Sequence, residues 1–455
     1  MNIIIVGCGK VGYTLADQLC AEGHDITVVD NNPAKVAAVT DNMDVIGLVG
    51  NGISHQVLLD AGAADADLFI AVTGDDEKNL LSCMIAKRTG NCQTIARVRD
   101  PLYNKEIEFL KKNFDLAMIV NPEMASAAEI ARIFQFPSAI SVDSFAKGHA
   151  DLLSFKIPID SKMDGLVLKE LHSTIGSHVL VCTVERDDDV FIPNGSFIFH
   201  GGDIVSIVAE RKNAVAFFDA MGIMKRTVKN AMLAGGSKVA FYLARELVDA
   251  GIHTTIIEKD MARCEELCDL IPKATIINGD ATDQALLREE GIATIQGFAA
   301  LTGIDEENIL LSLYANQVSD ENTKTVTKIG RISFQNVINK MNLGSIIYPR
   351  DITAESILRH VRSQAGSMNS CNVENLYKLA NNKAEALEFN VSEGSPITGK
   401  TLAQLHLKPN TLLCAIYRDG KVILPNGSDT VHPGDSVLVV IAGYRVNDIK
   451  DIMEG

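Results

Sequence analysis

Two segments of the chain carry glycine-rich turns of the kind that hold the phosphates of a nucleotide. The first is Gly7-Cys8-Gly9-Lys10-Val11-Gly12, a GxGxxG pattern between an apolar run and an expected helix. Gly7 permits the tight turn, Gly9 lets the backbone approach a pyrophosphate, and Gly12 lets the helix pack close to the strand. Free N–H groups at the start of the helix then meet the phosphates, helped by the helix dipole. These residues predict a dinucleotide-type binding loop.

An acid follows this loop at the distance that ribose recognition requires. Asp30 ends the next apolar run, roughly 20 residues beyond the glycines, and its carboxylate can accept hydrogen bonds from ribose hydroxyls. An acid here would repel a 2′-phosphate, which favours NAD(H) over NADP(H). The adenosine ribose is the same in NAD, ATP and ADP, so ATP and ADP remain open at the same site. A glycine turn with an exposed aspartate and no ligand is the structural alternative.

The second glycine turn belongs to a repeat of the whole chain. Asn230–Glu258 repeats the pattern of Asn2–Asp30, so that Glu258 matches Asp30. The matching turn comprises Gly235, Gly236, Ser237, Lys238, Val239 and Ala240. Ser237 adds a side chain where the pyrophosphate should approach, whereas alanine in place of the third glycine is tolerated. The second turn is therefore expected to bind nucleotide weakly, or to keep the fold without the ligand.

Further polar residues are expected where strands end, because ligands bind at the carboxyl ends of strands in open α/β sheets. They are Asn51, Thr73, Gly74 and Arg97 in the first unit, and Asp280, Thr302 and Gly303 in the second. The acids at 75–77 and 305–307 are interpreted differently. They begin expected helices, where carboxylates cap free N–H groups and oppose the dipole.

The repeat defines the expected architecture. Strands that alternate with helices predict two tandem Rossmann-like parallel-sheet domains, near residues 1–123 and 230–350. Each is followed by a helical stretch and by a small β-rich domain, near residues 143–226 and 368–455. Asn194-Gly195 and Asn426-Gly427 recur between apolar runs in the small domains, and Asn-Gly in that setting predicts the turn of a β-hairpin. The fold class is therefore α/β, with two Rossmann-like and two small α+β domains.

Composition limits the classes of function. The 455 residues carry a formal net charge of −16 and a pI near 5.1, so the chain has no electrostatic reason to bind nucleic acid. Its apolar runs are shorter than the roughly 18–20 residues that span a bilayer, and no signal peptide is expected. The nine cysteines lack metal-ligand spacing and suit a reducing cytoplasm. No metal site and no membrane insertion are expected.

Several motifs together resemble one family. The loops at 72–79 (VTGDDEKN) and 301–308 (LTGIDEEN), the tandem glycine turns and the paired small domains resemble the TrkA regulatory proteins of Trk potassium-uptake systems, which are built of paired RCK domains. The shorter segments 95–99 and 349–354 agree, and the resemblance covers essentially the whole chain.

The resemblance implies a function that the residues alone do not. Such a protein binds the cytoplasmic face of a membrane potassium channel or transporter subunit and regulates it in response to nucleotide. A complete ring of RCK units, two from each chain, implies a homotetramer. The resemblance assigns the first nucleotide site to Gly7–Val11, Asp30, Asn51, Thr73, Gly74 and Arg97, and the second to Gly235–Val239, Glu258 and Asp280.

Two other classes of function compete with this one. An NAD-dependent oxidoreductase would need an acid or base beside the hydride. The histidines that recur in the small domains, such as His200 and His432, lie far in sequence from the glycine loop, so no catalytic residue is assigned and no enzyme activity is expected. A soluble nucleotide or redox sensor with another protein partner is the third possibility, because the acidic charge suits ordinary solubility as well as a basic partner surface.

Overall fold

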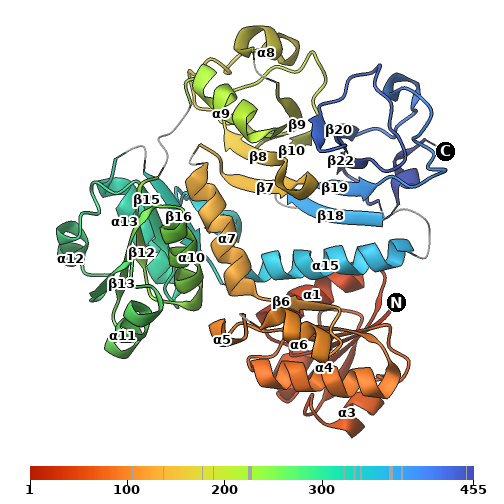
Figure 1. Cartoon of the computed structure of the whole chain (residues 1–455), viewed down its shortest axis with the longest axis vertical. Helices are drawn as coiled ribbons and strands as arrows, with labels where there is room; N and C mark the ends of the chain where they lie inside the picture. Colours follow the sequence, from red (N-terminus) through yellow and green to blue (C-terminus); the bar gives the residue numbers. More distant parts are fainter. Residues whose placement is uncertain are drawn as a thin grey trace.

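The chain folds into two parallel α/β sheets and two smaller antiparallel sheets, so the predicted fold class is confirmed (Figure 1). The computed structural model describes residues 1–104, 106–136, 138–176, 178–187, 189–223, 228–320, 323–330, 335–338, 341–367, 372–380, 383–446 and 448–454. The expected domain edges at residues 226, 368 and 455 lie outside the described residues.

The first parallel sheet is built from the apolar runs around the first glycine turn. Its strands are β1 (Asn2–Val6), β2 (Asp25–Asp30), β3 (Ile46–Val49), β4 (Leu68–Ala71), β5 (Gln93–Arg97) and β6 (Met118–Val120), in the order β3-β2-β1-β4-β5-β6. Its helices are α1 (Lys10–Ala21), α2 (Pro33–Thr40), α3 (His55–Asp60), α4 (Asp76–Gly90), α5 (Pro101–Asn104) and α6 (Ile107–Asn113). The strand order reverses direction between β1 and β4, and the crevice at their carboxyl ends is where ligands bind in such sheets.

The second parallel sheet repeats this order. Its strands are β12 (Asn230–Ala234), β13 (His253–Glu258), β14 (Thr275–Asn278), β15 (Gly297–Ala300), β16 (Lys324–Lys328) and β17 (Ser345–Ile347), in the order β14-β13-β12-β15-β16-β17. Its helices are α10 (Lys238–Asp249), α11 (Met261–Leu270), α12 (Gln284–Glu289), α13 (Asp305–Val318) and α14 (Gln335–Ile338). The reversal between β12 and β15 therefore forms a second crevice.

Both small domains are five-stranded antiparallel sheets. The first contains β7 (Ser141–Phe145), η1 (Ala146–Gly148), β8 (Ala150–Lys156), α8 (Leu168–Ile175), β9 (Leu180–Arg186), β10 (Asp189–Phe191), β11 (Ile204–Ala209) and α9 (Arg211–Ala220). The second contains β18 (Asn372–Leu379), β19 (Ala384–Asn390), η2 (Leu402–Gln404), β20 (Thr411–Arg418), β21 (Lys421–Ile423), β22 (Ser436–Ala442) and η3 (Ile449–Ile452). One cluster of buried side chains, including Leu152 and Leu438, joins the two small domains.

The Asn-Gly pairs do not form the hairpin turns predicted for them. The β20–β21 hairpin pairs Arg418 with Lys421 and turns at Asp419-Gly420, where both residues have positive φ angles. Asn194 instead lies in the long connection after β10, where its side-chain oxygen accepts a hydrogen bond from the Ser196 amide at 3.0 Å. An asparagine side chain stabilises such a local turn as readily as a hairpin, so the prediction placed the right residue type in the wrong turn.

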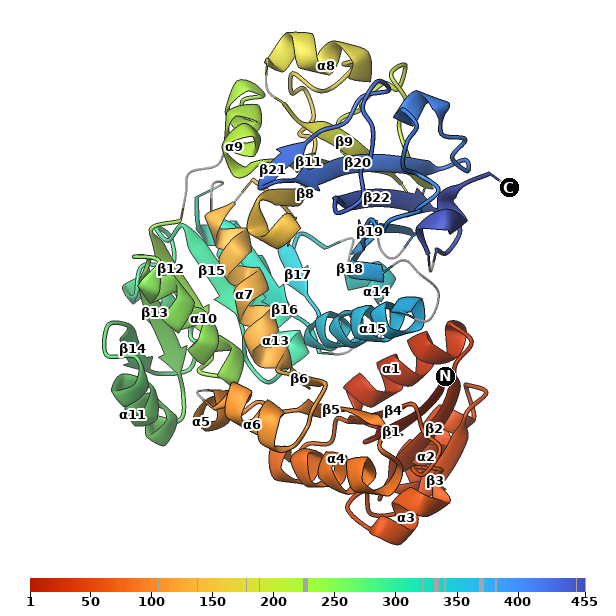
Figure 2. The same cartoon turned by 45° about the vertical axis from the view of Figure 1, so that its right-hand side comes forward.

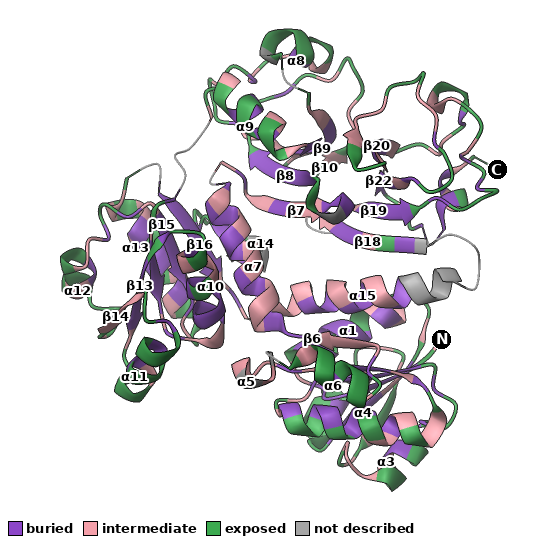
Figure 3. Ribbon diagram, in the orientation of Figure 1, coloured by how far each residue is buried: buried purple, intermediate pink, exposed green. Residues whose placement is uncertain are grey.

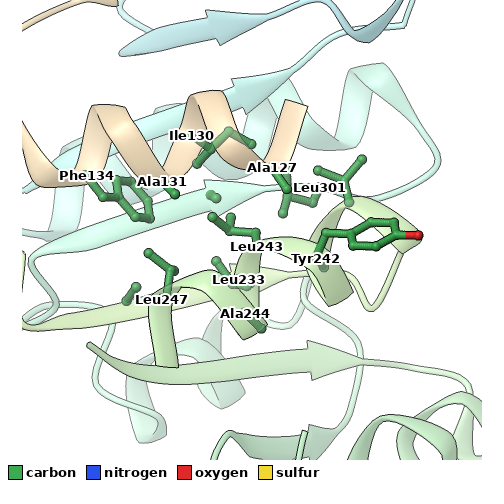
Figure 4. Close-up of a cluster of buried hydrophobic side chains, with 14 of the residues drawn as sticks. Ala127, Ile130, Ala131, Phe134, Leu233, Tyr242, Leu243, Ala244, Leu247 and Leu301 are labelled. Carbon is green, nitrogen blue, oxygen red and sulfur yellow. The ribbon is translucent and has the colours of Figure 1, made fainter. Parts of the chain in front are cut away.

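The two halves exchange their connecting helices. Helix α7 (Pro122–Gln135) leaves the first sheet and packs on α10 of the second, whereas α15 (Pro349–Ser367) leaves the second sheet and packs on α1 of the first (Figures 1 and 2). Figure 4 shows Phe134 of α7 among core side chains of the second unit, and its ring fills the space that a side chain at Gly297 would need. Leu358 of α15 is equally buried in the core of the first unit. The core of each parallel-sheet domain therefore includes a helix from the other half of the chain.

The burial pattern agrees with a packed, multi-domain protein. Figure 3 shows buried residues along the strands and on the inner faces of α7 and α15, with exposed residues on the outer helices. No helix among the residues described above is both long and apolar enough to cross a membrane.

Candidate nucleotide-binding sites

The first glycine loop has the geometry predicted from its sequence. Gly7 has a φ angle of +105°, and a Cβ there would lie 2.9 Å from the backbone nitrogen of Thr73. A Cβ on Gly12 would lie 1.8 Å from the carbonyl oxygen of Gly7, so only glycine fits. Gly9 faces open space, with nothing within 4 Å of its ideal Cβ. The loop thus leaves room for a ligand at the point where its backbone starts α1.

Helix α1 presents unused donors to this space. It buries Val11, Leu15 and Leu19 on one face, the spacing of an amphipathic helix, and so is held firmly against the sheet. Gly9 is its N-cap and supplies no side-chain hydrogen bond. The first amides of a helix have no partner within the helix. An anionic group at Gly9 would therefore meet free N–H groups and the positive end of the dipole.

Asp30 lies beside the loop, at the end of β2. Its Oδ2 accepts a hydrogen bond from the Cys8 amide at 2.8 Å, and its Oδ1 accepts one from the Asn32 amide at 2.9 Å. A carboxylate has about four acceptor positions, so capacity remains for ribose hydroxyls. Burial, together with the charge of Asp30, raises the pKa of the Cys8 thiol to about 12, which makes this cysteine an unreactive packing residue.

A cavity of about 810 Å³ opens in front of the loop and brings the predicted residues together. The residues of the predicted first site that line it are Gly7, Gly9, Lys10, Val11, Asp30, Asn51, Thr73, Gly74 and Arg97. Cys8 and Gly12 are not in the lining. The Cys8 amide donates a hydrogen bond to Asp30, and Gly12 lies in close contact with the Gly7 carbonyl.

Thr73 and the acids after it shape the rim of the cavity. The Thr73 amide and hydroxyl both donate to Asn79 Oδ1, at 2.9 and 2.7 Å. Asp75 caps α4 by accepting a hydrogen bond from the Lys78 amide, so the helix-start interpretation is confirmed there. Asp76 does more than begin the helix, because it accepts hydrogen bonds from the Arg99 and Asp100 amides and fixes the loop after β5.

The second unit contributes to the same cavity, which the sequence did not indicate. Lys238 and Val239, predicted as part of the second site, line the first cavity instead, and Ser237 lines both. Lys328 and Arg350 of the second unit also face the first cavity. The two cavities therefore adjoin at Ser237 and Gly303, which line both of them.

This shared wall is rich in cations. Arg97 pairs with Glu123 at 3.3 Å, and burial lowers the pKa of Arg97 although Glu123 raises it. Burial likewise lowers the pKa of Lys328. Within the part of the chain that the structure describes, Arg97 Nε, Arg350 Nη2 and Glu123 Oε2 are buried without a hydrogen-bond partner. Such atoms are costly unless a ligand or water satisfies them. The two arginine nitrogens suit an anion, whereas the Glu123 oxygen needs a hydrogen-bond donor.

The second crevice is built from the same parts but is partly closed. Glu258 accepts hydrogen bonds from the Gly236 and Asp260 amides at 2.6 and 2.8 Å, as Asp30 does in the first unit. Ser237 is the N-cap of α10, and its hydroxyl accepts a hydrogen bond from the Ala240 amide at 3.4 Å. The cavity measures about 340 Å³ and is lined by Gly235, Gly236, Ser237, Glu258 and Asp280 among others. The side-chain cap that α1 lacks is thus present at the start of α10.

The sequence-based prediction did not include four residues that line the first cavity: Arg99, Glu123, Lys328 and Arg350. Lys328 ends β16 as Arg97 ends β5, so the repeat carried a signal for that residue. Arg350 reaches the first cavity because the two units pack against each other, and no local pattern reports that. No histidine lines either cavity among the described residues, and these residues contain no group of three or more possible metal ligands.

Comparison with known sequence families agrees with the repeat. The family description "TrkA-N domain" matches residues 3–122 and 231–349, and "TrkA-C domain" matches residues 152–222 and 386–454. The two matches to each description correspond to the two parallel sheets and the two antiparallel sheets.

Known proteins of the same length are similar throughout. The Trk system potassium uptake protein TrkA of Haemophilus influenzae is 31% identical over 100% of this chain and 99% of its own length. The Trk system potassium uptake protein TrkA homolog 1 of Methanosarcina mazei is 30% identical over 99% of both chains.

Solved structures share the fold. The structure described as "GsuK channel bound to NAD" is 15% identical, covers 97% of this chain and 76% of its own, and has a TM-score of 0.62. The GsuK RCK domain gives the same identity and TM-score over 97% of this chain and 92% of its own. The resemblance noted from the sequence is confirmed: the chain belongs to the TrkA family of Trk-system potassium uptake proteins.

Proposed function

We propose that the chain is the nucleotide-binding regulatory subunit of a Trk-type potassium uptake system. It would bind the cytoplasmic face of a membrane-embedded channel or transporter subunit and control that subunit without catalysing a reaction. The observation that carries this proposal is the first crevice, where the uncapped start of α1, the Asp30 carboxylate and a cationic wall enclose one cavity. The relatives named for Trk potassium uptake supply the choice of partner.

NAD(H) is the ligand that we propose for the first site, with ATP or ADP as the alternative. Asp30 disfavours a 2′-phosphate, and the free amides at Gly9 suit a pyrophosphate. Lys238, Lys328 and Arg350 extend positive charge beyond the loop, which suits any nucleotide with several phosphates. At the second site we propose weaker binding of the same ligand class, because Ser237 occupies part of the helix start.

Regulation would follow from the position of the cavity between the two units. A ligand shifts an equilibrium only by its different affinity for the two states. A nucleotide that contacts the glycine loop and also Lys238 binds best at one spacing of the units, and therefore stabilises that spacing. A coupling of about 1–3 kcal/mol would give a clear response at the membrane subunit.

We also propose that the chain assembles as a homotetramer. Helices α4 and α13 occupy matching positions in the two units and expose matching apolar side chains: Leu81 and Met84 on α4, and Leu310 and Leu313 on α13. Leu310 is 66% exposed. Repeated contacts of one such face with another, head to tail, close into a ring. Replacing Leu310 by Asp should therefore give smaller particles in light scattering; an unchanged tetramer would remove this face from the assembly.

Calorimetric titration tests the proposed site. Wild-type protein, Asp30→Ala and the matched variant Glu258→Ala are each titrated with NADH, NAD, ATP and ADP. The hydrogen bonds of a charged group contribute about 1.5–3 kcal/mol, so Asp30→Ala should weaken the tighter binding roughly 10–100-fold. Glu258→Ala should leave that tighter binding within about threefold, because it lies at the other crevice.

The same samples separate regulation from catalysis. NADH absorbance is followed with a panel of small carbonyl substrates, and the proposal expects binding without turnover. Steady oxidation of NADH would instead establish an oxidoreductase. No binding of any nucleotide to the wild-type protein would reduce the glycine loop to a structural turn and end the proposal.

A further inference from the structure

One buried arginine joins the nucleotide-binding helix to the second small domain. Arg362, on α15, is 5% exposed. Its Nε and Nη2 donate to Glu22 Oε1 at 3.1 and 2.6 Å, and its Nη1 donates to Glu385 Oε2 at 3.1 Å. Glu22 is the C-cap residue that follows α1, and Glu385 lies on β19. We call this group the Arg362 clamp.

A second contact joins the same two elements. Arg445, which follows β22, donates from Nη1 to the carbonyl oxygen of Ala21 at 2.6 Å. Ala21 is the last residue of α1, so its carbonyl is among those with no partner inside the helix. An arginine there also meets the negative end of the helix dipole. The carboxyl end of α1 is thus bonded to the second small domain directly and through α15.

The other end of α1 is the glycine loop. The helix spans Lys10–Ala21, about 18 Å at the usual rise per residue. It packs along α15, which lies between α1 and the second small domain in both views (Figures 1 and 2). A displacement of the loop end would therefore move Glu22, and Arg362 would carry that displacement to β19.

Among the described residues, the first small domain has no clamp at the positions that match Arg362 and Glu22. When Pro122 and Pro349 are aligned, the position of Arg362 is occupied by Gln135, and its side chain accepts a hydrogen bond from Arg211 of α9 at 2.7 Å. Glu22 aligns with Ala250, which cannot form an ion pair. At these aligned positions, the ion pair between the end of the first helix and the crossover helix is therefore present in one half of the repeat only.

The chemistry of the clamp suits transmission better than apolar packing would. A buried guanidinium with its carboxylates fixes direction as well as distance, and breaking one of its contacts leaves a buried charge unpaired. Apolar surfaces are non-directional and lack that constraint. Burial would lower the pKa of Arg362, but hydrogen bonds to Glu22 and Glu385 raise it above its ordinary value, so the clamp stays charged.

We propose that the Arg362 clamp, with Arg445, transmits nucleotide occupancy of the first site to the second small domain. This inference rests on the proposed nucleotide binding. Arg362 is a positioning residue in this account, because it touches no ligand.

Hydrogen exchange of the full chain, with and without NADH, tests the proposal. In the wild-type protein, NADH should slow exchange at the glycine loop and also by about threefold at β19, far from the ligand. In Arg362→Met the loop should stay protected while the effect at β19 is lost. Arg445→Met, an exposed substitution, should weaken the effect at β19 and covers the case in which Arg362→Met fails to fold. Arg211→Met, which breaks the local bond to Gln135, is the matched control and should leave it intact.

The outcomes separate the two proposals. No protection of the glycine loop in the wild-type protein would overturn the proposed function and this inference with it. Protection of the loop without any change at β19, or a change at β19 that persists in both folded variants, would overturn the inference alone. Loss of stability in Arg362→Met with the remote response intact would make the clamp purely structural.

Discussion

The two Rossmann-like domains have the same strand order and a carboxylate at the end of their second strand, yet they start their first helix differently. In the first domain the N-cap of α1 is Gly9, which adds no side chain to the cavity. In the second the N-cap of α10 is Ser237, whose hydroxyl accepts the Ala240 amide. The presence or absence of one hydroxyl group therefore decides whether an amide at the helix start is available to a ligand or is hydrogen-bonded within the protein.

The packing of the crossover helices is equivalent in the two halves. Each sheet is completed by the crossover helix of the other half, so the cores are alike. Two differences bear on the ligand, namely the start of the first helix and the clamp on α15. A duplicated fold can thus keep its packing symmetric while only one crevice keeps an open binding loop.

The exchanged helices give the largest expected effect. Phe134→Ala removes a fully buried ring and should destabilise the protein by about 3–5 kcal/mol. Because Phe134 packs on Gly297, the rate of amide hydrogen exchange should rise in the second unit, although Phe134 follows the first unit in the sequence. Leu358→Ala should do the reverse and loosen the first unit, at a cost of about 2–5 kcal/mol. Hydrogen exchange measures which unit is loosened. Faster hydrogen exchange only in the half of the chain that carries the substitution would contradict the swapped packing of the two helices.

The next largest effect concerns the third glycine of the loop. Gly12→Ala places a Cβ against the Gly7 carbonyl and should cost about 1–3 kcal/mol in stability. Since the displaced loop also carries Gly9, nucleotide affinity at the first site should fall by about 100-fold or more. Calorimetry and urea unfolding measure the two losses. Ala240 occupies the matching position in the second unit without such a clash, so Ala240→Gly should cost no more than about 1 kcal/mol. A folded Gly12→Ala protein with normal affinity would refute the account of the loop.

Much of this site could be predicted from the sequence because it is local. The roles of Gly7, Gly12 and Asp30 follow from a turn and from strand ends that lie close together along the chain. Matching positions in the second half of the repeat supported each assignment. Lys328 and Arg350 reach the first cavity through the pairing of the two units, which no local pattern encodes. Asn194-Gly195 failed for another reason. Its side chain can close a turn inside a loop, so the dipeptide alone does not identify a hairpin.

The junction of the crossover helices predicts a pH dependence shared by both halves. Burial, then the charges of Asp143 and Glu355, raise the pKa of Glu129 on α7 from 4.5 to about 8. Burial also raises the pKa of Glu355 on α15 to about 7. Between the unfolded and folded pKa values the folded chain holds a proton that the unfolded chain releases, so the free energy of unfolding falls as the pH rises.

Glu129→Gln should remove most of this dependence. At pH 8.5 the variant should be more stable than the wild-type protein by about 1–3 kcal/mol, and at pH 5 the two should nearly coincide. Glu355→Gln should also be more stable than the wild-type protein at pH 8.5, by a smaller free energy of unfolding. Urea unfolding at both pH values measures the difference. A variant that is less stable than the wild type at pH 8.5 would show that the Glu129 carboxylate is ionised and well paired.

The smallest effect is the most direct test of the comparison between the two helix starts. Ser237→Gly should free the Ala240 amide and strengthen nucleotide binding at the second site by about 3–10-fold, since one helix-end hydrogen bond contributes about 1 kcal/mol. The change should cost only a few tenths of a kcal/mol in stability, because glycine is also a good N-cap. The reciprocal change, Gly9→Ser, should weaken the first site by a similar factor while leaving its fold intact, because nothing lies within 4 Å of the added Cβ. Calorimetry on both variants decides the matter. Opposite shifts would assign the difference between the domains to this one position, whereas a second site that stays weak in Ser237→Gly would assign it to the smaller cavity around Glu258.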